Sequence, residues 1–239
     1  MCGRFALIKN LDLLMDEFDI NYEKEILESS KEEYTPTDQI IAIYHKSEKN
    51  KKMGRRLRWG LLPNFIKNWE QIKNYSLFNA RSESLEEKPS FRNLLNTNRC
   101  IIPSDVFFEY KSEGKVKDKY AFTLESKSTF AMAGLWDSWI NPKTNQEILS
   151  CTILTTIANE IVRPVHEKNR MPVILEKEFY EKWLDISIKF SDLKYMLKPF
   201  PESKMKSEKI IRTDKLNLPS ETQKSSGQFE DTQPSLFGS

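Results

Sequence analysis

Apolar residues along the chain fall mostly into short β-branched and aromatic runs separated by polar, turn-forming segments. Runs of this kind predict strands. The predicted strands cover residues 39–44, 57–61, 75–80, 100–110, 120–124, 130–136, 149–156 and 171–175. Between them, Thr35-Pro36-Thr37 predicts a turn, and the basic, polar segment 46–56 predicts a hairpin loop.

Helical periodicity is confined to short segments. Apolar residues recur at helical spacing over 11–18, which predicts an amphipathic helix. Two further helices are expected around 177–184 and 191–197, the second with Ser191 as its N-cap. Many short strands, few helices and no alternation of strands with long helices favour an α+β fold. We expect a curved, mostly antiparallel, barrel-like β core with flanking helices.

The composition changes near Pro201. Residues 1–200 carry nearly all of the predicted strands and helices and are expected to form one domain that holds the active site. Residues 201–239 are rich in Lys, Glu, Ser, Gln and Pro. Such a segment buries too little apolar surface to fold by itself, so we expect a largely disordered tail with one last strand near 209–212.

Composition and charge narrow the class of protein further. The chain has 239 residues and a net charge of +2, so overall charge neither requires nor excludes a nucleic-acid partner. Three cysteines argue against a disulfide scaffold, and two histidines without paired cysteines argue against a metal site. We expect no cofactor. The apolar runs are too short to span a bilayer, and no signal peptide is evident, so the sequence predicts a monomeric cytoplasmic protein with no membrane partner.

The most distinctive chemistry lies at the start of the chain, Met1-Cys2-Gly3-Arg4-Phe5. Removal of Met1 would leave Cys2 with a free α-amine and a thiol on adjacent carbons. An aldehyde condenses with such a pair to an imine, and the thiol then closes a thiazolidine ring. The α-amine, with an ordinary pKa of about 8 against about 10.4 for lysine, is the better nucleophile at neutral pH. Cysteine is also a common small hydrophobic residue, so Cys2 alone decides nothing.

Three polar residues stand where a core strand would favour apolar ones. Asn79 closes a predicted strand, Glu109 lies within an aromatic run, and His166 precedes another apolar strand. A buried carboxylate is costly without a partner, which makes Glu109 the most informative of the three. Each also has an ordinary structural interpretation: a turn cap for Asn79, a solvent-facing strand edge for Glu109, and a packed or surface histidine for His166.

Taken together, these segments resemble the SOS-response-associated peptidase family, the abasic-site-processing proteins. The matching segments appear in family order over residues 1–200. They are Met1-Cys2-Gly3-Arg4-Phe5, Arg58-Trp59-Gly60-Leu61-Leu62-Pro63, Asn79-Ala80-Arg81-Ser82-Glu83, Cys100-Ile101-Ile102-Pro103-Ser104-Asp105 with Phe108-Glu109-Tyr110, Ala131-Met132-Ala133-Gly134-Leu135-Trp136, 152–156, and His166 with Arg170-Met171-Pro172.

The resemblance implies a covalent thiazolidine crosslink between Cys2 and abasic sites in single-stranded DNA. Cys2 would be the nucleophile, and Asn79 would position it. Glu109 would transfer protons, and His166 would assist opening of the sugar ring and reversal of the adduct. A histidine is the usual choice for protonating a sugar oxygen near neutral pH. The family also implies removal of Met1 by the protein itself or with assistance, and the same imine is compatible with an abasic-site lyase activity.

A DNA-binding set follows from the same resemblance. Arginines would contact phosphates, and apolar side chains would lie beside the bound strand. The expected residues are Arg4, Pro36, Trp59, Phe65, Ile66, Arg81 and Arg170. Two departures from the family pattern stand out. Three residues instead of one separate His166 from Arg170, and the family's asparagine-rich last strand is poorly represented near 210–214.

Two other classes of function remain open on the sequence alone. One is an N-terminal-nucleophile amidohydrolase, in which Cys2 attacks an amide with its own amine as base. The other is a non-catalytic nucleic-acid-binding module. The tail adds a candidate partner, because Gln233-Pro234-Ser235-Leu236-Phe237 resembles the peptide by which bacterial repair proteins dock on the sliding clamp. Gln233, Leu236 and Phe237 would be the anchoring side chains.

Overall fold

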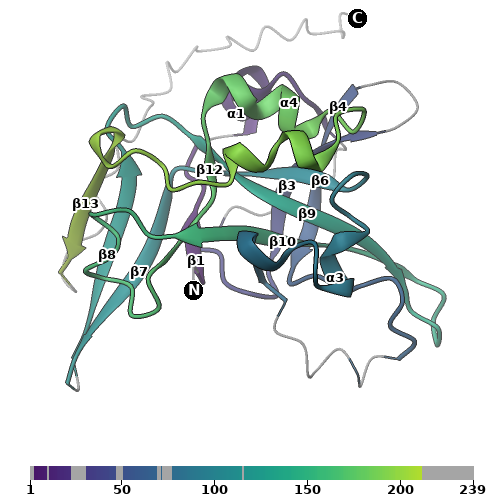
Figure 1. The fold of residues 1–239 in the computed structure, drawn as a ribbon, viewed down its shortest axis with the longest axis horizontal. Helices are drawn as coiled ribbons and strands as arrows, with labels where there is room; N and C mark the ends of the chain where they lie inside the picture. The colour runs from purple at the N-terminus through teal and green to yellow at the C-terminus, as the bar shows by residue number, and fades with distance from the viewer. Residues whose placement is uncertain are drawn as a thin grey trace, which may run out of the picture.

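A closed barrel of five strands forms the centre of the molecule (Figure 1). In the computed structural model the described residues are 3–9, 11–22, 31–46, 51–68, 71, 77–114 and 116–211. The barrel strands are paired in the order β10-β4-β3-β6-β9, and β9 pairs again with β10 to close the ring. They are β3 (Gln39–Lys46), β4 (Lys51–Trp59), β6 (Arg99–Ser104), β9 (Phe130–Ile140) and β10 (Glu147–Ile157).

Most pairings around the barrel are antiparallel, as the sequence predicts. The exception is β10, which runs parallel to β4 and to the short β5 (Asn79–Arg81). All six residues of β6 and the first six of β9 are buried. Strands covered on both faces read as continuous apolar runs, which explains why these segments lack alternation. The remaining short strands, β2 (Asn21–Tyr22), β11 (Arg170–Pro172) and β12 (Ile174–Leu175), extend the same sheet.

A second sheet of four strands flanks the barrel. Its order is β1-β7-β8-β13, built from β1 (Arg4–Ala6), β7 (Val106–Glu113), β8 (Val116–Leu124) and β13 (Met205–Ile210). The N-terminal strand β1 pairs antiparallel with β7, with Arg4 opposite Phe108. This sheet therefore brings the start of the chain against the strand that carries Glu109.

Helices are few and short. The helix α1 (Leu11–Phe18) has the predicted bounds and lies beside α4 (Tyr180–Leu184), where the Phe18 and Tyr180 rings stack at 5.5 Å (Figure 1). A single turn of helix, α3 (Pro89–Arg92), precedes β6. The fold is thus the predicted curved, mostly antiparallel barrel with flanking helices.

Several predicted boundaries differ from the structure. The segment 46–56, expected as a loop, contributes β4 from Lys51 onward, because it pairs residue by residue with β3. The single run 100–110 is divided into β6 and β7 at Asp105, whose carboxylate accepts hydrogen bonds from the amides of Ile8 and Lys9 at 2.6 and 3.0 Å.

The C-terminal part differs as well. The expected helix 191–197 is a pair of 3-10 turns, Phe190–Asp192 and Lys194–Met196, and Lys189 rather than Ser191 precedes the first. The last strand, β13, begins at Met205 and pairs with β8 over its whole length, because the cross-strand partner supplies what the local sequence lacks. Cys2 and the predicted tail from residue 212 onward, with Gln233, Leu236 and Phe237, lie outside the described residues.

The described residues lack two kinds of feature. None of the helices in that part of the chain is long and apolar enough to cross a membrane. Within the same residues, no group of three or more His, Cys, Asp or Glu side chains could hold a metal ion.

Candidate active site

Glu109 and His166, which are 57 positions apart in the printed sequence, face each other below the protein surface. Glu109 Oε1 lies 3.5 Å from His166 Nε2, and the two side chains are 8% and 3% exposed. Glu109 Oε1 accepts no hydrogen bond from any residue that the structure describes. Catalytic pairs are often this loose before a substrate tightens them.

The backbone after His166 selects the tautomer of its ring. The amide of Lys168 donates a hydrogen bond to His166 Nδ1 at 3.0 Å. Since Nδ1 accepts, the proton of the neutral imidazole resides on Nε2, the nitrogen nearest Glu109. The ring therefore presents an N–H group toward the carboxyl group.

Burial makes both partners neutral near pH 7. It raises the pKa of Glu109 to about 8 and lowers the pKa of His166 to about 4. The 3.5 Å separation would suit an ion pair. The two pKa values instead indicate that Glu109 is a carboxylic acid and His166 a neutral imidazole between about pH 4 and pH 8. Near neutral pH the pair therefore holds one proton on the Glu109 carboxyl group and one on His166 Nε2.

The N-terminal strand runs toward this pair. Arg4 lies opposite Phe108 in the antiparallel register of β1 and β7. Extending that register by one residue brings Gly3 level with Glu109. The strand is fastened at its other end by Asp105, which accepts the amides of Ile8 and Lys9 and the hydroxyl of Thr129 at 2.6 Å. The register therefore brings Gly3, the first described residue of the chain, beside Glu109.

Asn79 and Arg81 lie at the two ends of β5. This strand lies parallel to β10, with Asn79 beside Ile153 and Arg81 beside Thr155. Asn79 is half-buried, whereas Arg81 is exposed. The short strand thus holds a partly covered amide and an exposed cation two positions apart.

The connection that carries His166 is built by two asparagines. Asn159 Oδ1 accepts the amide of Val162 at 3.2 Å, and its Nδ2 donates to the carbonyl of Phe200 at 2.8 Å. Asn169 has a φ of 52°, a left-handed conformation that Asn tolerates, and its amide donates to the carbonyl of His166 at 2.8 Å. The two extra residues between His166 and Arg170 are therefore accommodated in a tight turn that begins at the histidine.

Among the predicted DNA contacts, three side chains have the exposure that the role requires. Arg4 is exposed and its guanidinium pairs with Glu33 at 3.1 Å. Phe65 is 50% exposed in a loop, and Arg81 is exposed beside Asn79. Pro36 is half-buried within the predicted turn.

Trp59 and Ile66, predicted as DNA contacts, are buried. Trp59 has no exposed surface, donates its indole N–H to the carbonyl of Phe78 at 2.8 Å and meets the Phe5 ring edge-on at 5.2 Å. It supports the N-terminal strand from below instead of facing a base. Ile66, expected to be exposed beside Phe65, packs with Trp139, which donates to its carbonyl at 2.6 Å. The local sequence does not reveal that Trp59 and Ile66 are buried, because the residues that cover them are distant in the sequence.

Arg170 also lies below the surface. Its guanidinium binds both carboxylate oxygens of Glu83, at 2.7 and 2.9 Å, and the carbonyl of Thr155 at 2.5 Å. The structure thus gives its terminal nitrogens protein partners where a phosphate was expected. Glu83 received no separate role from the sequence. The local sequence around Glu83 gives no signal of this pairing, because its partner Arg170 lies 87 positions later in the chain.

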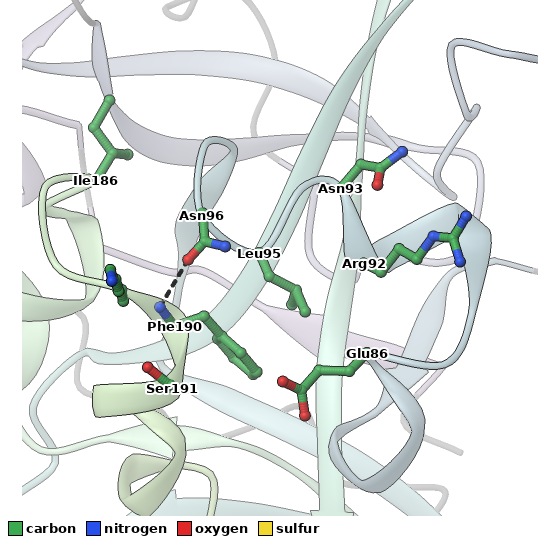
Figure 2. A pocket seen from close by; sticks show the side chains of 9 residues that line it. Glu86, Arg92, Asn93, Leu95, Asn96, Ile186, Phe190 and Ser191 are labelled. Carbon is green, nitrogen blue, oxygen red and sulfur yellow. Dashed lines mark hydrogen bonds between the residues drawn. The ribbon is translucent and has the colours of Figure 1, made fainter.

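A separate open pocket of about 580 Å³ lies elsewhere, between α3 and the turn Phe190–Asp192 (Figure 2). Arg92 and Glu86 line one side of it, and on the opposite side the amide of Phe190 donates to Asn96 Oδ1 at 2.8 Å (Figure 2). Its lining includes none of the predicted site residues.

Comparisons with known proteins identify the family of the chain. The family model described as SOS response associated peptidase (SRAP) matches residues 1–213. The abasic site processing protein YoqW of Bacillus subtilis is 37% identical over 227 residues, which cover 92% of this chain and 97% of that protein. The abasic site processing protein YMR114C of Saccharomyces cerevisiae is 30% identical, covering 86% of this chain and 62% of that protein. A crystal structure of a protein from Bacteroides thetaiotaomicron superposes with a TM-score of 0.82 at 27% identity, covering 88% of this chain and 93% of the other.

Proposed function

Because this chain belongs to the SOS response associated peptidase family, we propose that it processes abasic sites in single-stranded DNA by forming a thiazolidine crosslink through Cys2. The observation that supports the proposal best is the buried, neutral Glu109–His166 pair toward which the N-terminal strand runs. The names of the relatives YoqW and YMR114C point to the same substrate.

The proposed reaction begins after hydrolysis of the Met1–Cys2 peptide bond, either by this site or with assistance. As the ring of the abasic sugar opens to the aldehyde, the proton of its 1′-hydroxyl passes to the ring oxygen. His166 assists by donating a hydrogen bond from Nε2–H to that oxygen and keeps its own proton. The Cys2 amine adds to the aldehyde carbon to give a carbinolamine. Glu109, protonated at neutral pH, gives its proton to the departing hydroxyl so that water leaves, and its carboxylate then takes a proton back from the iminium nitrogen. The Cys2 sulfur then bonds to the imine carbon, and its proton passes to nitrogen.

Ring closure also bears on strand cleavage. An imine at the sugar carbon permits β-elimination of the 3′ phosphate, which is the lyase reaction. Addition of the thiol consumes the imine and stops that elimination. We therefore expect crosslinking to dominate and lyase activity to increase when the thiol is absent and the amine remains. Cys2→Ser retains the amine and a weaker nucleophile, so it is the variant that separates the two reactions.

DNA would be held by the exposed members of the predicted set. Arg4 and Arg81 contact phosphates, and Phe65 stacks on a base beside the lesion. Asn79 orients the amine and the sugar without a change of charge. An abasic nucleotide has no base to unstack, which itself favours its entry into the site.

The proposal is tested with an abasic single-stranded oligonucleotide on a denaturing gel and by intact mass spectrometry. The wild type should give a covalent band whose mass is the sum of both molecules less one water. Cys2→Ala, or a tag fused before Cys2, should give none. Cys151→Ala, at a thiol buried in the barrel, should crosslink as the wild type does. A full-strength adduct from Cys2→Ala would disprove the mechanism.

The tail suggests delivery to replication forks. Gln233-Pro234-Ser235-Leu236-Phe237 supplies an apolar Leu-Phe anchor at the end of a polar segment. A peptide of residues 230–239 should bind a purified bacterial sliding clamp in fluorescence polarisation, and Leu236→Ala should abolish that binding. Equal binding by both peptides would remove the clamp from the proposal.

A further inference from the structure

We infer that Glu83 and Arg170 are positioning residues: their ion pair locks the segment that carries Asn79 to the segment that carries His166. The inference rests on the proposed function for its catalytic consequence. The geometry itself stands on the contacts of the described residues. Glu83 and Arg170 together form the clamp pair.

The clamp pair is a bidentate ion pair between a buried arginine and a half-exposed glutamate. The two guanidinium Nη atoms lie 2.7 and 2.9 Å from the two carboxylate oxygens. Arg170 is 9% exposed at its side chain, whereas Glu83 is 51% exposed. A planar fork matched to a carboxylate has one favourable orientation, which is why such pairs confer geometric specificity.

The pair spans three strands. Arg170 opens β11, directly after the turn of His166. Glu83 lies in the 3-10 turn Ser82–Ser84, which follows β5 with Asn79 and Arg81. Between them lies β10, which pairs with both strands at Thr155: with Arg81 on one side and Pro172 on the other.

Thr155 completes the connection. Arg170 Nη2 donates to the Thr155 carbonyl at 2.5 Å and to its hydroxyl oxygen at 3.3 Å. That hydroxyl donates in turn to the carbonyl of Ala80 at 3.4 Å, next to Asn79 in β5. A continuous hydrogen-bonded path therefore leads from the strand after His166 to the residue after Asn79.

This arrangement distinguishes positioning from phosphate binding. A phosphate at Arg170 would bring a second anion next to the Glu83 carboxylate at a largely buried guanidinium. If the clamp pair instead sets the distance between Asn79 and His166, substitution of either member should slow adduct formation, although the two side chains carry opposite charges. The sign of the effect at Glu83 therefore decides between the two roles.

The decisive measurement is the titration of the His166 ring by NMR in the full-length protein, which needs no DNA. The charged and titratable groups that act on this ring include the N-terminal ammonium group, Glu109, Lys168 and Arg170. Loss of the negative charge of Glu83 can only lower the pKa of His166 or leave it unchanged by direct electrostatics. Loosening of the turn admits water and raises it toward 6.5. We expect Glu83→Gln to raise the pKa of His166 by about 0.5 to 1.

A second measurement compares crosslinking with DNA affinity. Glu83→Gln and Arg170→Lys should each slow adduct formation about tenfold while the Kd for undamaged single-stranded DNA stays within about twofold. The matched control is Glu160→Gln, which breaks the exposed Glu160–Arg163 pair in the same connection and should change neither quantity. Because Glu83 is half exposed, its variant should fold even if Arg170→Lys does not.

Each outcome decides the inference. An unchanged or lowered pKa of His166 in Glu83→Gln overturns it, as does tighter DNA binding by that variant, which would mark Arg170 as a phosphate ligand. If the wild type forms no adduct, the proposed function fails, but a raised pKa of His166 in Glu83→Gln still supports the positioning role.

Discussion

Glu109 and His166 illustrate how two single residues couple the stability of the fold to pH. The pKa of Glu109 is raised by burial from 4.5 to about 8, so the folded protein binds an extra proton between those values and loses stability as the pH rises through them. The pKa of His166 is lowered from 6.5 to about 4, so stability is lost as the pH falls through that interval. The two effects oppose each other between about pH 4.5 and pH 6.5. Above that interval only the Glu109 effect remains.

Glu109→Gln is therefore expected to stabilise the fold and to disable the chemistry. The amide removes the cost of ionising a buried carboxyl, so its Tm should exceed that of the wild type by several degrees at pH 8.5 and by much less at pH 5.5. Adduct formation should fall roughly 10²-fold or more, since a positioned proton donor is lost. Thermal unfolding at the two pH values and gel kinetics check both parts. An identical Tm difference at both pH values would show that Glu109 is ionised in the fold.

At the scale of elements, the turn from His166 to Asn169 decides where the histidine points. Two hydrogen bonds close this turn: the Lys168 amide donates to His166 Nδ1, and the Asn169 amide donates to the His166 carbonyl. The sequence showed the two-residue extension before Arg170 but not its conformation. The left-handed backbone of Asn169 is what allows the longer connection to return to β11.

A substitution at Asn169 tests this turn. Asn169→Gly should be nearly neutral, whereas Asn169→Val should cost about 1–2 kcal/mol and slow adduct formation, because a β-branched residue resists positive φ. Asn145→Val is the matched control, since Asn145 has a φ of 55° in the distant β9–β10 hairpin. It should lose similar stability in denaturant unfolding and keep the wild-type adduct rate. Equal rates of adduct formation in both valine variants would show that the turn at Asn169 does not influence the reaction.

At the scale of the whole molecule, closure of the barrel depends on close packing inside it. Gly134 in β9 pairs with Cys100 of β6 on one side and Ile153 of β10 on the other. A Cβ at Gly134 would lie 2.3 Å from Ile102 Cδ1 and 2.9 Å from the backbone oxygen of Thr152. The strands on both sides of β9 approach too closely for any side chain at this position.

Gly134→Ala is accordingly expected to destabilise the protein by about 1–3 kcal/mol or more, because backbone must move to admit the methyl group. Gly114→Asn, at a hairpin tip with φ of 62° and no atom within 4 Å of its added Cβ, should change stability little. Urea unfolding of both variants checks the contrast. A Gly134→Ala protein as stable as the wild type would mean that the barrel expands more freely than its packing indicates.

Much of the element pattern was readable before the structure. Short β-branched runs predicted nearly every strand, and α1 has the predicted bounds. The errors at β4 and β13 share one cause. Polar, charged segments become strands there because a neighbouring strand supplies the hydrogen bonds, and that partner is remote in sequence.

The sequence by itself determined the reactive candidates and the barrel-like class of fold. Cys2, Asn79, Glu109 and His166 were found because polar groups among apolar runs are costly and family motifs are local. Only the tertiary structure decided that Glu109 and His166 meet at 3.5 Å, that Trp59 and Ile66 are buried, and that Arg170 binds Glu83. Exposure and pairing depend on contacts between distant segments, and those contacts exist only once the barrel has closed.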